Sequence, residues 1–68
     1  MKSVLDDIEG IGPTRRKALM KKFQSLENIR NASVEELARI DGMNQKAAES
    51  VYQFFHLKKA SENDAMNS

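Results

Sequence analysis

The stretch that decides the fold is IEGIGPTRRK, residues 8–17, in which two glycines lie on either side of one apolar residue. Glycine adopts positive φ angles and allows close approach of the backbone. Pro13 suits the first position of a helix because its missing N–H would be unpaired there anyway. The stretch therefore predicts a tight turn that leads into a helix. Main-chain amides at such a turn point outward together and form an anion site, and phosphate is the anion that we expect.

The same pattern returns at an offset of 32 residues, from 8 to 40, as IDGMNQKAAESV over residues 40–51. Gly42 matches Gly10, and Asn44 stands where the first copy has Gly12. Both residue types are good N-caps, and asparagine also tolerates left-handed dihedral angles. A repeat at this spacing indicates a duplicated supersecondary unit. Because only two copies are present, we expect a pseudo-symmetric pair of hairpins.

Size and composition limit the possible classes of protein. Sixty-eight residues allow one small domain, and the absence of cysteine excludes disulfides and thiolate metal sites. No apolar run in the sequence approaches the roughly 18 residues of a membrane span, and the N-terminus lacks the apolar region of a signal peptide. We therefore expect a cytoplasmic location.

Charge is sorted along the chain, although the net charge is only +1. Residues 13–22 carry five basic side chains and no acid, whereas residues 1–9 and residues 23–44 each sum to −2. The five are Arg15, Arg16, Lys17, Lys21 and Lys22. A run of charge is usually a solubilising helix face, but its place beside a Gly-x-Gly turn favours a surface that meets an anion.

The apolar spacing predicts helices joined by short turns, and no stretch alternates as a strand would. Ser25 is a predicted N-cap, and Ser33 with Glu36 forms a predicted capping box. The expected helices cover residues 4–7, 13–22, a short segment after 25, 34–39 and 45–57. The expected core consists of Leu5, Ile8, Ile11, Leu19, Phe23, Leu26, Ile29, Val34, Leu37, Ile40, Met43, Val51 and Phe55. Residues 58–68 are polar, which predicts a disordered tail.

Three segments, residues 5–19, 31–37 and 48–56, resemble the C-terminal domain of the UvrC family. UvrC is the incising nuclease subunit of bacterial nucleotide excision repair. The resemblance covers roughly residues 3–57 and implies a compact, all-α, SAM-like tandem helix-hairpin-helix domain of about five short helices. Its hairpins would be residues 8–12 and 40–44. Arg16 departs from the general hairpin pattern, which favours a small residue there, but arginine is typical of UvrC-like sequences.

The resemblance implies binding to DNA without sequence specificity, in which each hairpin grips one side of the minor groove through phosphates. It also implies a preference for bubbles or junctions between single and double strands, and the other excision repair subunits as partners. The expected DNA-binding residues are Gly10, Ile11, Gly12, Thr14, Arg15, Arg16, Lys17, Gly42, Met43, Asn44, Gln45 and Lys46. Phosphate contacts position a protein and carry almost no information about bases.

Catalysis is not expected of this chain, nor is a cofactor or a metal site. His56 is the sole histidine and has no neighbouring acid or cysteine, while Asp6 and Asp7 are adjacent and diverge on a helix. In the family, the nuclease chemistry lies in other domains. The competing function is pairing with another protein, as in XPF-type nucleases, through an exposed Tyr52, Phe54 or Phe55.

Overall fold

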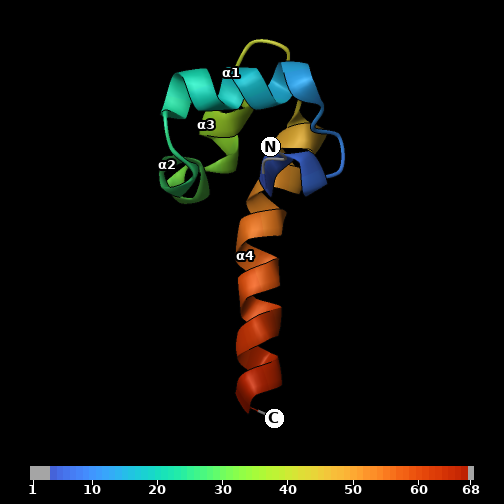
Figure 1. The fold of residues 1–68 in the computed structure, drawn as a ribbon. Coiled ribbons are helices and arrows are strands. Elements are labelled where there is room, and N and C mark those ends of the chain that lie inside the picture. Colours follow the sequence, from blue (N-terminus) through green and yellow to red (C-terminus); the bar gives the residue numbers. More distant parts are fainter. Residues whose placement is uncertain (1–3, 68) are drawn as a thin grey trace.

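A computed structural model describes residues 4–67, and it describes their side chains as far as His56. The elements are a 3-10 helix, η1 (Val4–Asp7), and four α-helices: α1 (Pro13–Phe23), α2 (Leu26–Asn31), α3 (Val34–Ala38) and α4 (Gln45–Asn67). The described residues contain no β-strand, so the predicted all-α class is confirmed. Figure 1 shows η1, α1, α2 and α3 gathered around the first turns of α4, whose second half extends away from them. None of the described helices is long and apolar enough to cross a membrane.

Local side-chain bonds begin the short helices where the sequence predicts. The Ser25 hydroxyl accepts from the Asn28 amide at 3.1 Å and caps α2. At α3 the capping box is complete: the Glu36 amide donates to the Ser33 hydroxyl at 3.1 Å, and the Ser33 amide donates to the Glu36 carboxylate at 3.0 Å. Pro13 occupies the first turn of α1. Each bond satisfies an amide that would otherwise lack a partner at a helix start.

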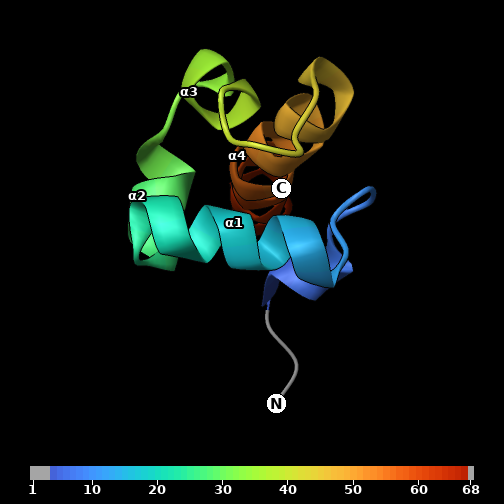
Figure 2. The same cartoon turned by 90° about the horizontal axis from the view of Figure 1, so that it is seen from above.

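The core lies where α3 packs on α4, and α1 packs on α2 and η1. Viewed from above, α1 crosses one side of α4 while α3 lies on another (Figure 2). The buried residues are Leu5, Ile8, Ile11, Leu19, Ile29, Ala32, Leu37, Ile40, Ala47, Ala48 and Val51. The remaining predicted core residues, Phe23, Leu26, Val34, Met43 and Phe55, are partly buried and pack against this cluster. Ala47 and Ala48 lack bulk, so the start of α4 can lie close to its neighbours.

The end of α4 differs from the prediction. The sequence predicts that the last helix ends near Leu57, whereas α4 continues to Asn67. The disorder of residues 58–68 stays a prediction. No proline or glycine follows residue 42, so no residue in this stretch breaks a helix that has already started. The side chains beyond residue 56, residues 1–3 and residue 68 lie outside the described residues. The proposed domain limits, 3 and 57, therefore stay a prediction.

The capping box makes stability depend on pH. The Ser33 amide, which donates to the Glu36 carboxylate, holds the pKa of that carboxyl below its usual 4.5, and the Ser33 side chain and the nearby Arg39 act in the same direction. Because the pKa is lower in the folded state, this carboxylate stabilises the fold above the unfolded pKa, and the contribution is lost as the pH falls through the folded pKa.

We therefore expect Glu36→Gln to reduce the loss of stability on acidification. Glutamine retains an oxygen that can accept from the Ser33 amide but has no proton to gain. Urea unfolding at a series of pH values from about 6 to 3 measures the free energy of unfolding in both proteins. The curve of the variant should be flatter than that of the natural chain, and parallel curves would contradict this assignment.

Candidate nucleic-acid interface

The two hairpins share one backbone geometry. In the first, the Ile11 amide donates to the Ile8 carbonyl at 3.1 Å; in the second, the Met43 amide donates to the Ile40 carbonyl at 3.0 Å. Gly10 has a φ of 86° and Gly42 a φ of 84°. A side chain is strained at such angles, so glycine is the residue that both turns require. The duplication predicted from the amino-acid sequence is therefore also present in the hydrogen bonds of the two turns.

Each hairpin leads directly into a helix, again in the same way. The Arg16 amide donates to the Gly12 carbonyl and the Ala48 amide to the Asn44 carbonyl, both at 2.9 Å. The two entrances differ in their caps. The Asn44 side chain accepts from the Ala47 amide at 2.7 Å, whereas Gly12 offers no side-chain cap to α1. Because Pro13 has no N–H, each entrance leaves two helix amides open, those of Thr14 and Arg15 at α1 and those of Gln45 and Lys46 at α4.

Four exposed amides are available to an outside acceptor. Within the described part of the chain, the amides of Gly10, Gly12, Gly42 and Asn44 donate no hydrogen bond. They lie at or just before the N-termini of α1 and α4, where the helix macrodipole adds partial positive charge. Such a group of amides binds an anion. By contrast, Ile11 is buried and Met43 is partly buried, and both use their amides inside the turns.

Arg15 connects the two hairpins. Its Nε donates to the Gly42 carbonyl at 2.9 Å, and its Nη1 donates to the Gly10 carbonyl at 2.8 Å. The carbonyls of both positive-φ glycines therefore lie within reach of one guanidinium group. The sequence predicts Arg15 beside the first anion site, but it contains no sign of this contact between residues 27 positions apart.

Comparison with known proteins agrees with this geometry. The chain matches the SAM-like helix-hairpin-helix tandem family over residues 2–56. The chain belongs to this family. It is similar to UvrABC system protein C of Lachnospira eligens, with 63% identity over 54 residues, and to that of Finegoldia magna, with 57% identity over 54 residues. Each alignment covers 79% of this chain and 9% of the relative, so the chain spans a small part of the relatives' length.

A second arginine of the tandem is also held internally. Arg16 Nε lies 3.2 Å from Asp6 Oδ1, and both side chains are largely covered. This ion pair joins α1 to η1, so Arg16 does not extend freely from the hairpin. The matching residue of the second repeat, Ala48, is fully buried. The sequence predicts a DNA contact at Arg16, whereas the structure gives it a partner within the domain.

The other predicted contacts remain on the surface of the tandem. Thr14, Lys17 and Lys46 are exposed and form no hydrogen bond or ion pair through their side chains within the described residues. The Gln45 side chain instead donates to the Glu49 carboxylate at 3.1 Å along α4. Thr14 and Lys46 occupy matching positions in the two repeats, so one hydroxyl and one ammonium group stand beside the two sets of open amides.

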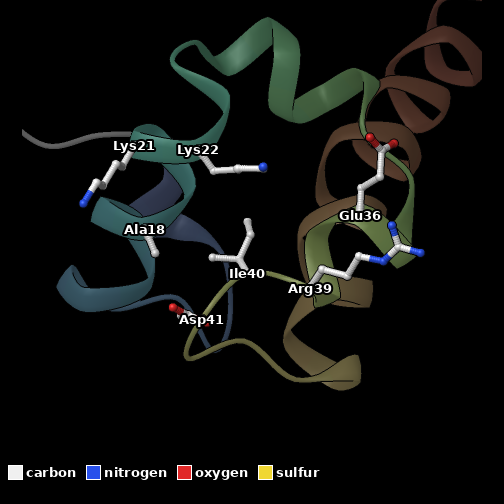
Figure 3. A pocket seen from close by; sticks show the side chains of 7 residues that line it. All are labelled: Ala18, Lys21, Lys22, Glu36, Arg39, Ile40 and Asp41. Carbon is white, nitrogen blue, oxygen red and sulfur yellow. The ribbon is translucent and has the colours of Figure 1, made fainter.

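An open groove of about 710 Å³ lies between α1 and α3. Figure 3 shows Ile40 and Ala18 on its surface, with Lys22 extended across it toward Glu36 and Lys21 directed outward. Glu36 and Asp41 lie among the basic groups, so the groove does not present charge of a single sign. Part of the basic segment of residues 13–22 therefore faces acids of this domain, and one of these acids, Asp41, belongs to the second hairpin.

The described residues contain no group of three or more His, Cys, Asp or Glu side chains that could hold a metal ion. The His56 ring stacks on Tyr52, with ring centroids 4.2 Å apart, and its Nε2 lies 3.1 Å from the Arg30 carbonyl. These contacts join α4 to the last turn of α2. They give His56 a role in packing.

The two glycines of the first turn allow a matched test. We expect Gly10→Ser to destabilise the tandem by about 1–2 kcal/mol because serine must adopt a left-handed φ there. Gly12 has an extended backbone and open space around it, so Gly12→Ser should change stability by less than about 0.5 kcal/mol. Urea unfolding of both variants measures the difference. Equal losses would contradict the requirement for positive φ at Gly10.

Proposed function

We propose that this tandem is a DNA-binding module of an excision repair nuclease, and that both hairpins bind phosphates of the same DNA. Its relatives carry the name UvrABC system protein C. The observation that supports the proposal is the pair of glycine turns, each with exposed amides free to donate and both linked by one guanidinium group. Amides of this kind select the phosphate backbone and leave the bases unread.

The residues around the turns have distinct roles in this proposal. The amides of Gly10, Gly12, Gly42 and Asn44 donate to phosphate oxygens. Thr14 adds a hydroxyl, Lys17 and Lys46 add charge, and the Gln45 amide adds a donor at the start of α4. Ile11 and Met43 shape the turns and anchor them to the core. Arg16 orients α1 through Asp6.

The two hairpins support a duplex as the ligand, whereas the proposed preference for a junction or bubble rests on the resemblance to UvrC-like domains. Two hairpins that hold phosphates on the two sides of a minor groove fit a duplex, and we propose that a junction or bubble beside this duplex is the preferred substrate. The domain would thereby help to position incision, while the nuclease chemistry lies in other parts of the full-length protein. The remaining excision repair subunits are the protein partners that we propose, in the cytoplasm.

Pairing with another protein is the alternative function. Among the described side chains, the exposed large hydrophobic ones are Val4, which is 45% exposed, and Tyr52, which is 38% exposed. They lie on different elements, η1 and α4, and the Tyr52 ring already stacks on His56. Single exposed apolar side chains are normal on a monomer. These observations favour DNA binding, and sedimentation at high concentration tests the alternative.

Binding to a labelled bubble duplex should be weak and should fall steeply with salt. Non-specific contacts give dissociation constants on the order of 10⁻⁴–10⁻⁶ M, and each phosphate neutralised contributes about −0.9 to the slope of log K against log salt. We expect Lys17→Ala and Lys46→Ala each to make that slope less steep by about 0.9. Fluorescence anisotropy at four or more salt concentrations measures both quantities.

Arg30→Ala is the matched control. It also removes one positive charge, but from α2, which follows the end of α1 that is remote from the first hairpin. Its slope should equal that of the natural chain. The proposal fails if the natural chain does not bind the bubble duplex in dilute buffer. It also fails if loss of Arg30 weakens binding as much as loss of Lys17 or Lys46.

A further inference from the structure

Arg15 uses two of its three guanidinium nitrogens inside the domain. Nε donates to Gly42 and Nη1 to Gly10, at 2.9 and 2.8 Å, and the side chain is half-buried. The acceptors are the carbonyls of the two glycines with positive φ, one in each hairpin. No other side-chain hydrogen bond joins the two turns within the described residues. The relative position of the turns therefore depends on this side chain together with the core.

The repeat is not symmetric at this residue. Ala47 occupies the position in the second copy that Arg15 occupies in the first, and its side chain is buried. The alanine side chain has no donor, so α4 makes no equivalent hydrogen bond to the first hairpin. A single arginine therefore donates to both turns. The guanidinium group suits this role because its donors lie in a rigid planar fork. A lysine ammonium is a point charge on a flexible stem and does not reproduce that geometry.

We propose that Arg15 is a positioning residue that holds the two hairpins at the separation at which both bind one DNA molecule. This inference rests on the proposed function. When two binding elements are fixed at a suitable separation, the second binds as an intramolecular step, and the overall affinity exceeds that of either element alone. If the link is lost, each hairpin keeps its own phosphate donors, but the second binding step becomes less favourable.

A phosphate ligand and a positioning residue respond differently to substitution. If Arg15 neutralised a phosphate, Arg15→Lys would keep the charge and would bind much like the natural chain, and Arg15→Ala would make the salt slope less steep by about 0.9. If Arg15 positions the hairpins, lysine at this position does not restore DNA binding. Both variants then bind about tenfold more weakly with an unchanged salt slope, because the phosphate contacts themselves are retained.

The first arm of the test needs no DNA. Amide spectra of the ¹⁵N-labelled chain compare the natural sequence with Arg15→Lys and with the matched control Lys17→Ala, at an exposed residue two positions further along α1. The Gly42 carbonyl and the Met43 amide belong to one peptide group, so loss of the bond to Arg15 changes the polarisation of that amide. We expect the Met43 signal to shift in Arg15→Lys and to stay in place in Lys17→Ala. An unmoved Met43 signal in Arg15→Lys overturns the proposal.

The second arm measures binding of the same proteins, with Arg15→Ala, to the bubble duplex at several salt concentrations. These measurements use a temperature at which the amide spectra show every variant folded; if Arg15→Ala does not fold, Arg15→Lys carries the test. A tenfold loss in Arg15→Lys without a change of slope supports the positioning role. Natural affinity in Arg15→Lys overturns that role and leaves the proposed function standing. Absence of binding by the natural chain overturns both.

Discussion

Apolar residues on either side of each glycine hold both turns against the core, and the exposed amides depend on this constraint. Ile8 and Ile11 flank the first turn and are buried, while Ile40 and Met43 flank the second and are buried or partly buried. With both flanks anchored, the two residues between them must reverse the chain at the surface, and the second of them, a glycine, adopts positive φ. Both glycines are exposed, and the turn bonds leave their amides without partners in the described part of the chain.

Main-chain donors would give the proposed interface its chemical character. They are placed by the fold and lose little conformational freedom when they bind, in contrast to long flexible side chains, whose ordering costs entropy. They also carry no formal charge, so a domain with a net charge of only +1 can still present an anion site. Of the five basic residues near the first hairpin, Arg15 and Arg16 have partners within the domain, and Lys21 and Lys22 line the groove with Glu36 and Asp41. Local geometry, more than total charge, therefore accounts for the proposed function.

Much of this fold could be predicted because its signals are local. The caps at Ser25 and Ser33 and the turns at Gly10 and Gly42 are determined by residues within a few positions of one another. The role of Arg15 could not be predicted in the same way, because its acceptor at Gly42 comes close only after folding. The pairing of Arg16 with Asp6 likewise depends on how η1 packs beside α1. The sequence predicts both arginines as ligands of the anion, which stays a prediction, and it gives no sign of their contacts inside the domain. Ala32 is buried although the sequence does not predict it as a core residue, because a single alanine in a short polar segment gives no periodic signal.

The most direct measurement is a titration of the ¹⁵N-labelled chain with a short forked duplex in dilute buffer, followed through its amide signals. If both turns hold one phosphate backbone, the amides of Gly10, Gly12, Gly42 and Asn44 will shift together and will fit a single dissociation constant. Undisturbed signals at these four amides, or shifts in one hairpin alone, would contradict the account.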